Sequence, residues 1–208
     1  DSFNNIWIHT NAHTLLFIKK GTTEVIETKY EFGYVTDIDQ DADNCLWIST
    51  KNHGIFRVPI TQEGMLEQEI KLYSKGNADF SKNITTLSCS IDQVWIGTAE
   101  GAVYAIDKKT KEITNYSDQF ASINEGIQDI VVDDYDNIWI STNKRIVLFY
   151  PPYEIFKEFN QVDVIIDSFR KGAVYLTEDG QLLYGGNLGI TAFQTQKSKP
   201  QTQHQETF

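Results

Sequence analysis

The side chains best able to recognise a ligand fall in five short segments, four of which directly follow a threonine that ends an apolar run. His13 and His53 each lie three residues after such a threonine, and Arg145 takes the same place in a later segment. Imidazole, guanidinium, ammonium and amide groups hydrogen-bond to hydroxyl and carboxylate oxygens, so these segments predict a polar binding surface. The candidate residues are Asn11, His13, Lys51, Asn52, His53, Glu100, Asn143, Lys144, Arg145 and Asn187.

Catalytic and metal-binding motifs are a separate question. The sequence contains no nucleophile elbow, phosphate-binding loop or HExxH zinc helix. Two aspartate-rich runs raise a calcium hypothesis, since hard cations bind several carboxylates, but neither has the ligand spacing of an EF-hand loop. We interpret both runs as hairpin turns, and we expect no catalytic residue, no metal and no cofactor. The runs comprise Asp39, Asp41 and Asp43, and Asp133, Asp134 and Asp136.

An internal repeat must position these residues. All four tryptophans occupy the same slot of a motif that reads Trp-Ile-Gly-Thr from Trp95 and Trp-Ile-Ser-Thr from Trp139. A degenerate fifth copy has Leu183 in the tryptophan slot, and successive anchors are 40 to 48 residues apart. Because the slot recurs in blade after blade, we interpret the tryptophans as core residues that pack one unit on the next. The anchors are Trp7, Trp47, Trp95, Trp139 and Leu183.

Each unit reads as four short antiparallel strands. An alternating run is followed by an Asp/Asn turn, the tryptophan strand, a short loop and two further strands, as in residues 127–159. This is the size of one β-propeller blade, whereas a sandwich would not repeat one tryptophan slot and no segment keeps a helical period. We therefore predict an all-β fold with about five blade units in residues 1–193, a fragment of a seven-bladed propeller, and a linker at 194–208.

The incomplete first and last units, and the loops between strands, lead to two further structural expectations. The first unit begins at the tryptophan strand and the fifth lacks a clear fourth strand, so strand edges should be exposed and the chain should oligomerise, stay an open arc or close irregularly. In propellers the loop after the tryptophan strand and the loop entering each inner strand share one face. The candidate residues should therefore line one rim. His9 holds a slot that is occupied by Ser49, Gly97 and Ser141 in other units.

The composition of the chain limits the classes of partner that it could bind. The net charge of −11 disfavours nucleic-acid binding, because an acidic surface repels phosphate backbones. No apolar stretch is long enough to span a bilayer, so we expect no membrane contact in this segment. Cys45 and Cys89 lack the close spacing of a zinc or redox motif, and we interpret them as buried free thiols rather than a disulfide.

Residues 124–142, which include Asp133 and the Trp139 motif, closely resemble the two-component regulator propeller repeat. The copy at Trp95 keeps Trp-Ile-Gly-Thr and Gly101, and residues 180–193 look like the last blade of such propellers. The resemblance implies a periplasmic sensor region of a hybrid two-component histidine kinase of Bacteroidetes type, with catalysis elsewhere in the parent protein. It also implies an oligosaccharide or another small ligand, a homodimer formed through the parent sensor, and relay of a signal.

Two other function classes remain open at this stage. A structural module would use its blades for dimerisation and hold no ligand, and an exposed apolar patch at the blade edges would favour it. An enzyme such as a propeller lyase would need His13, His53 and a carboxylate to converge on one cavity. Glu100 is the only carboxylate that the sequence places on the rim.

Overall fold

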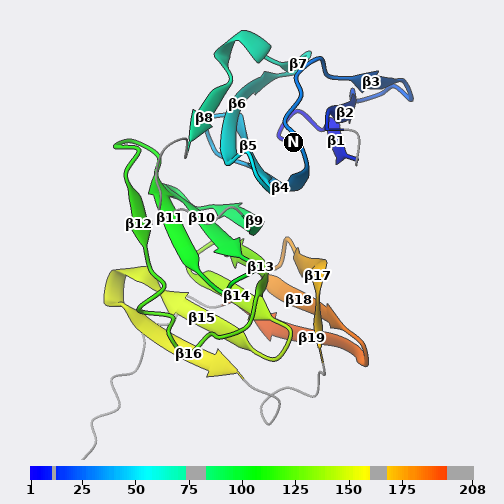
Figure 1. Ribbon diagram of the computed structural model, residues 1–208. Helices are drawn as coiled ribbons and strands as arrows, with labels where there is room; N and C mark the ends of the chain where they lie inside the picture. The colour runs from blue at the N-terminus through cyan, green and yellow to red at the C-terminus, as the bar shows by residue number, and fades with distance from the viewer. Residues whose placement is uncertain (11–12, 74–82, 160–167, 196–208) are drawn as a thin grey trace, which may run out of the picture.

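The computed structural model describes residues 1–10, 13–73, 83–159 and 168–195. Within these residues the chain forms nineteen strands in five sheets of antiparallel strands, and its only helical elements are two 3-10 turns, Glu67–Glu69 and Pro151–Tyr153. Figure 1 shows the sheets following one another round a common axis, with β4, β9, β13 and β17 innermost. The prediction of an all-β propeller is confirmed.

The five sheets are called blades 1 to 5 in chain order. Blade 1 contains β1 (Ile6–His9), β2 (Leu15–Ile18) and β3 (Val25–Glu27). Blade 2 contains β4 (Val35–Gln40), β5 (Cys45–Thr50), β6 (Ile55–Thr61), β7 (Gly64–Met65) and β8 (Lys71–Tyr73). Blade 3 contains β9 (Ile84–Cys89), β10 (Gln93–Thr98), β11 (Val103–Asp107) and β12 (Ile113–Asn115). Blade 4 contains β13 (Ile127–Val132), β14 (Ile138–Thr142), β15 (Ile146–Tyr150) and β16 (Ile155–Phe159). Blade 5 contains β17 (Phe169–Leu176), β18 (Gln181–Gly186) and β19 (Gly189–Gln194).

The strand order agrees with the predicted units and adds one element. Blade 1 begins at the tryptophan strand, blades 3 and 4 have four strands, and the described part of blade 5 has three. Blade 2 has the additional strand β7, which pairs with the end of β6 and was not predicted. The last strand runs to Gln194, and residues 196–208 of the predicted linker lie outside the described residues.

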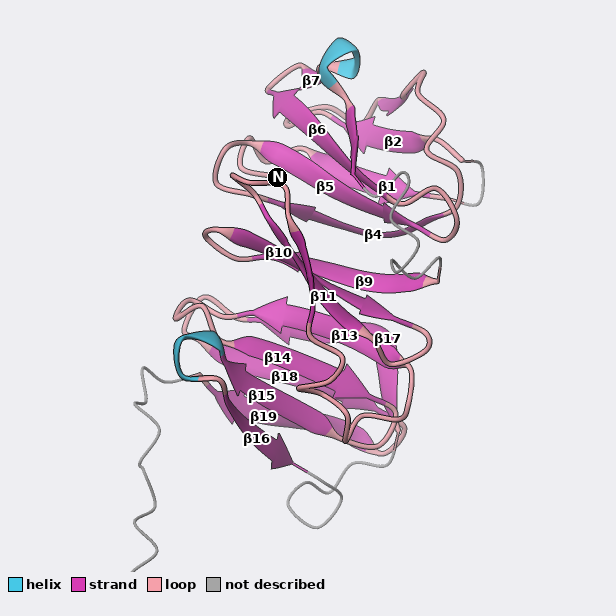
Figure 2. Ribbon diagram, turned by 60° about the vertical axis from the view of Figure 1, so that its left-hand side comes forward, coloured by secondary structure: helices cyan, strands magenta, loops and turns pink. Residues whose placement is uncertain are grey.

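The blades pack face to face, as the stacked sheets of Figure 2 show. Because side chains alternate between the two faces of a strand, Trp47 points toward blade 3 while its neighbours Leu46 and Ile48 point toward blade 1. The same alternation produces four hydrophobic clusters, one between each pair of successive blades. Trp47, Trp95 and Trp139 are buried in these clusters, which confirms their prediction as core residues.

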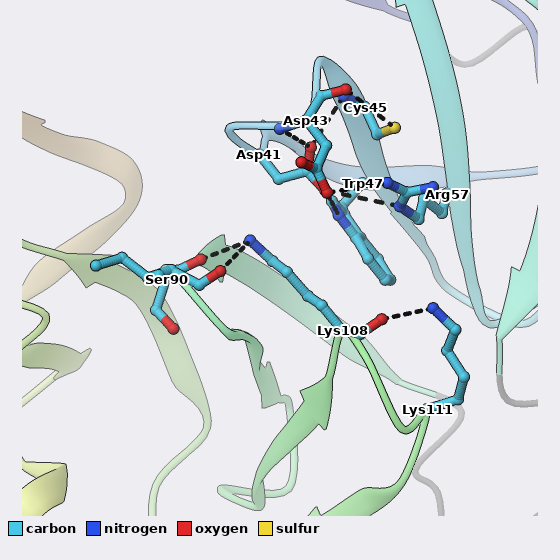
Figure 3. Close-up of polar contacts among 9 residues, drawn as sticks. Asp41, Asp43, Cys45, Trp47, Arg57, Ser90, Lys108 and Lys111 are labelled. Carbon is cyan, nitrogen blue, oxygen red and sulfur yellow. Dashed lines mark hydrogen bonds and ion pairs between the residues drawn. The ribbon is translucent and has the colours of Figure 1, made fainter.

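An aspartate six residues before the tryptophan holds the indole in three blades. Oδ2 of Asp41 accepts a hydrogen bond from Nε1 of Trp47 at 2.8 Å, and Oδ2 of Asp133 accepts one from Trp139 at 2.9 Å. Oδ1 of Asp41 accepts the backbone N–H groups of Asp43 and Cys45, so one carboxylate closes the hairpin and satisfies the indole (Figure 3). Asp1 and Trp7 repeat the arrangement in blade 1 at 2.7 Å.

Blade 3 departs from this arrangement. Its turn is one residue shorter, and Ser90, whose N–H donates to the carbonyl oxygen of Gln93, stands in the aspartate position. Nζ of Lys108 donates to the carbonyl oxygen of Ser90 at 2.5 Å (Figure 3). Nε1 of Trp95 is buried without a hydrogen-bond partner among the described residues. An orphaned buried donor of this kind costs about 1–3 kcal/mol.

Blade 5 has neither the tryptophan nor the aspartate of this hydrogen-bonded pair. Leu183 stands in the tryptophan slot, and Thr177 stands where the aspartate would be. The hydroxyl oxygen of Thr177 accepts the backbone N–H of Gln181 at 2.8 Å, so a threonine closes this turn at the position of the aspartate. Because leucine has no N–H to satisfy, the turn needs no second acceptor.

Trp95 and Trp139 differ in whether the indole N–H has an acceptor, and this difference predicts unequal losses of stability when each is replaced. We expect Trp139→Phe to lower the free energy of unfolding by about 1.5–3 kcal/mol more than Trp95→Phe, because only Trp139 gives up a hydrogen bond to a carboxylate. Both substitutions remove the same atoms, so the shared packing loss cancels in the comparison. Urea unfolding of the two variants measures the difference, and equal losses would show that the Asp133 bond contributes nothing.

Candidate functional site

The rim loops are fixed by the threonine that ends each tryptophan strand. Oγ1 of Thr50 accepts the backbone N–H of His53 at 3.0 Å, and Oγ1 of Thr142 accepts that of Arg145 at 3.2 Å. Both threonines are fully buried. The threonine therefore recurs because its hydroxyl caps the loop that presents the candidate residues.

The loops after the tryptophan strands lie beside the loops that enter the inner strands. The N–H of Lys51 donates to the carbonyl oxygen of Tyr34 at 2.9 Å, and that of Ala99 donates to Asn83 at 2.9 Å. Two kinds of loop thus share one face, as the propeller interpretation requires.

The described candidate residues are distributed over this face rather than gathered in one place. Arg145 is half-buried, and Asn11 lies outside the described residues. The eight exposed ones are His13, Lys51, Asn52, His53, Glu100, Asn143, Lys144 and Asn187. Because they come from five blades, a ligand on the rim would have to span neighbouring loops.

Several candidate side chains also have structural roles. His13 has a φ of 66°, so it adopts the left-handed conformation, a turn role that the sequence pattern assigned to Gly and Asn. The imidazole of His53 lies against Gly33, where an added Cβ would come within 2.4 Å of Nδ1. Neither His13 nor His53 lines the axial cavity described below, so the convergence that a lyase would need is not found there.

Arg145 belongs to an ion-pair network that sequence analysis did not predict. Its Nη2 lies 3.1 Å from Oε1 of Glu125, and its Nη1 lies 2.6 Å from Oε1 of Glu158. Nζ of Lys144 lies 3.5 Å from the same Glu125 oxygen. Oδ1 of Asn187 accepts hydrogen bonds from Nε and Nη2 of Arg170 at 2.9 and 2.7 Å. These contacts leave the rim polar but hold several of its side chains in place.

The inner strands are joined by side-chain rungs that sequence analysis missed. Oδ2 of Asp37 accepts the N–H of Leu87 at 3.0 Å, and in the next blade Oγ1 of Thr86 accepts the N–H of Ile130 at 3.2 Å. Oδ1 of Asp129 then accepts the N–H of Gly172 at 2.9 Å. Each rung satisfies a backbone donor at a strand edge with the side chain of the preceding blade. The sequence feature that could have revealed these rungs is a polar residue at the same register position of successive inner strands.

These inner strands border a cavity of about 330 Å³ on the propeller axis. Blade 1 contributes His9, blade 4 contributes Asp129, and blades 2 and 5 contribute the rest. The lining residues are His9, Tyr34, Val35, Thr36, Asp37, Asp129, Lys171 and Gly172. The axial cavity was not predicted, although the unusual slot of His9 pointed to it.

The two carboxyl groups of the axial cavity are electrostatically perturbed. The pKa of Asp129 is raised to about 6: burial is the largest cause and the nearby Asp37 adds to it, while the Gly172 N–H and Lys171 oppose the shift. Burial also raises the pKa of Asp37, although hydrogen bonds from Leu87 and Thr86 lower it in part. Desolvation is the largest cause in both cases, since the charged form loses water.

The aspartate-rich turns are closed by hydrogen bonds within the fold, and the two cysteines form no disulfide with each other. Cys45 and Cys89 are both free, and burial raises the pKa of each thiol. The carboxylates of Asp41 and Asp133 are occupied by backbone and indole N–H groups, which accounts for the turns without calcium. In the part of the chain that the structure describes, no three His, Cys, Asp or Glu side chains gather as a metal site.

Blades round an axis with a polar axial cavity define a β-propeller. No protein-family model and no curated protein matches this sequence. Among solved structures, the extracellular domain described as the hybrid two-component system BT3049 from B. thetaiotaomicron has a TM-score of 0.68 at 21% identity, over 91% of this chain and 25% of that one. The extracellular domain of the one-component system BT4673 from the same organism has a TM-score of 0.64 at 16% identity, over 91% and 26%.

An enzyme shares the same fold. Virginiamycin B lyase from Staphylococcus aureus has a TM-score of 0.63 at 18% identity and matches 92% of this chain and 67% of its own. At such identities the likeness establishes the fold alone, which confirms the predicted architecture. The chain spans about a quarter of the two Bacteroides domains, and no described helix is long and apolar enough to cross a membrane.

The raised pKa of Asp129 predicts a pH-dependent stability difference. A carboxyl whose pKa is higher in the folded state favours folding when protonated, so its contribution falls as pH rises from about 4 to about 6. We expect Asp129→Asn to be about 2 kcal/mol more stable than the parent chain at pH 7.5 and nearly equal to it at pH 4.

Urea unfolding of both chains at the two pH values measures this difference. Asp134→Asn, at an exposed position in the turn of the same blade, is the control for the change in net charge. A stability gain that is the same at pH 4 and pH 7.5 would show that ionisation of Asp129 does not destabilise the fold.

Proposed function

We propose that the chain is an extracytoplasmic sensor segment of a hybrid two-component signalling protein, which binds an oligosaccharide or another small ligand on its rim and relays a signal. The observation that carries this proposal is the fold shared with two extracellular signalling domains over 91% of the chain. The parent protein would then be a histidine kinase of the inner membrane, with this segment in the periplasm and catalysis elsewhere.

The rim chemistry supports a ligand rich in oxygen atoms. Exposed ammonium, imidazole and amide groups stand on neighbouring loops, and these groups hydrogen-bond to sugar hydroxyls and carboxylates. A ligand that spans two or more loops would favour one arrangement of the blades over another, which is how binding shifts a conformational population. The propeller itself would act as a binding module rather than an enzyme.

Thermal unfolding tests this proposal. A ligand that binds only the native state at about a hundred times its Kd should raise the melting temperature by about 5 °C or more. We expect such a shift from one member of a library of plant and host oligosaccharides, and its loss in the double variant Lys51→Ala, Asn143→Ala.

Lys109→Ala provides the matched control, because Lys109 is exposed in the turn between β11 and β12, away from the rim loops. A shift that survives the rim substitutions would place the ligand elsewhere. No shift from any member of the library would remove the support for a sugar sensor.

A structural module is the second candidate, and exposed apolar residues on the two end blades favour it. Ile190 of blade 5 is 73% exposed, although the equivalent Leu15, Ile55, Val103 and Ile146 of blades 1 to 4 are fully buried. At the other end, Ile6 of blade 1 is 58% exposed, whereas its equivalents are buried against the preceding blade. Both end blades therefore present an uncovered apolar face of the kind that packs inside the propeller, which suits self-association.

Sedimentation velocity tests the second candidate. If the end faces mediate association, Ile6→Lys and Ile190→Lys should each reduce the oligomeric fraction of this chain, because burying an ammonium group is unfavourable. Ile91→Lys is the control, since Ile91 is 76% exposed in the turn of blade 3. A monomeric parent chain, or variants that associate as the parent does, would contradict self-association through these faces.

A further inference from the structure

Asp129 has fewer hydrogen-bond donors than the other buried aspartates. It is 6% exposed, and in the described part of the chain the Gly172 N–H alone donates to it, 2.9 Å from Oδ1 and 3.1 Å from Oδ2. Asp37, at the equivalent position of blade 2, accepts from Ile38 N, Leu87 N and the hydroxyl of Thr86.

The contrast with Asp133, in the same blade, is larger still. That carboxylate accepts four hydrogen bonds, from two backbone N–H groups, an amide and an indole. A carboxylate offers about four acceptor sites, and a buried one is costly when they are not used. Asp129 is therefore a buried acceptor with unused capacity, and it lies on the wall of the axial cavity.

A second buried polar group, close enough to Asp129 to interact with it electrostatically, lacks a hydrogen-bond partner among the described residues. The hydroxyl of Tyr184 is buried without a hydrogen-bond partner among the described residues. It is near enough to Asp129 that the carboxylate adds to the rise in its pKa caused by burial. The carboxylate of Asp129 and the hydroxyl of Tyr184 thus both leave hydrogen-bonding capacity unused.

We propose that the axial cavity is a binding site for a small organic cation, whose primary ammonium group donates hydrogen bonds to Asp129 and faces Asp37. An ammonium group brings three N–H donors and one positive charge, which suit the donor-poor carboxylate of Asp129. An organic ammonium fits better than a metal ion, since no described cluster of three metal-binding side chains is present.

The size and lining of the axial cavity limit the rest of the ligand. A volume of about 330 Å³ holds a molecule of roughly ten non-hydrogen atoms, taking about 30 Å³ for each water-sized group. Tyr34, Thr36 and the exposed His9 and Lys171 add further polar groups to the wall, so hydroxyl groups on the ligand would find both donors and acceptors. A ligand in this position would contact blades 1, 2, 4 and 5 together. The inference does not depend on a ligand at the rim.

Affinity for the cation should depend on pH. The titratable groups that face Asp129 are Asp37, Lys171 and Tyr184, and His9 lines the same cavity. Because the pKa of Asp129 is about 6, only about one molecule in ten carries an ionised Asp129 at pH 5. Binding of a permanently protonated amine should therefore weaken by about tenfold between pH 7 and pH 5.

Isothermal titration calorimetry with a matched pair of probes tests the proposal. D-Glucamine and D-sorbitol have the same polyol chain, and they differ in a terminal ammonium or hydroxyl group. We expect D-glucamine to bind and D-sorbitol to bind at least tenfold more weakly. Asp129→Asn should abolish the preference, Asp134→Asn should keep it, and Lys171→Ala should tighten D-glucamine binding a few-fold by removing a like charge.

Each other outcome overturns the inference. Equal binding of the two probes would make the axial cavity a polyol site, and binding of neither would remove the site. A preference that persists in Asp129→Asn would place the cation elsewhere, and displacement of D-glucamine by equimolar KCl would indicate an inorganic cation. Because Asp129→Asn is expected to stabilise the fold, a loss of binding in that variant is not explained by unfolding.

Discussion

A buried indole N–H needs an acceptor, and in this chain the acceptor is built into the turn that precedes it. Asp41 and Asp133 each use one oxygen for the turn and the other for the indole, so the hairpin and the packing between blades are set together. A tryptophan fixed in this way fills the space between two blades. Where it is present, this contact helps to hold successive blades against one another round the axis.

The rungs between inner strands solve a second problem of the fold. An inner strand has one edge without a neighbouring strand, and its N–H groups would otherwise lack partners. Asp37, Thr86 and Asp129 supply oxygen atoms from the preceding blade to those edges. Bringing carboxylates to the axis for this purpose desolvates them, so the raised pKa of Asp129 follows from the way the blades are joined.

The sequence predicted what depends on local pattern. Strand alternation, the Asp/Asn turns and the tryptophan slot are written in a few consecutive residues, and Asn44 and Asp136 adopt the positive φ expected of such turns. The aspartate and the tryptophan that it bonds are always six residues apart, so this hydrogen bond also has a signal in the sequence. It was not predicted, because the aspartates were explained as turn residues. The ion pairs of Arg145 and the rung from Asp129 to Gly172 join residues 13 to 43 positions apart, so they depend on how the blades are placed.

Two departures from the repeat have different consequences because of where they lie. The indole N–H of Trp95 lacks an acceptor, but it is enclosed by Tyr116, Phe149 and other apolar side chains, so its cost falls on the stability of the fold. Asp129 is short of donors at the wall of a cavity, where a molecule from solution can supply them. An unsatisfied group in a packed core is a defect, whereas the same deficit beside open volume can be relieved by a ligand. For this reason the axial cavity, rather than the irregular turn of blade 3, is where binding free energy is to be gained.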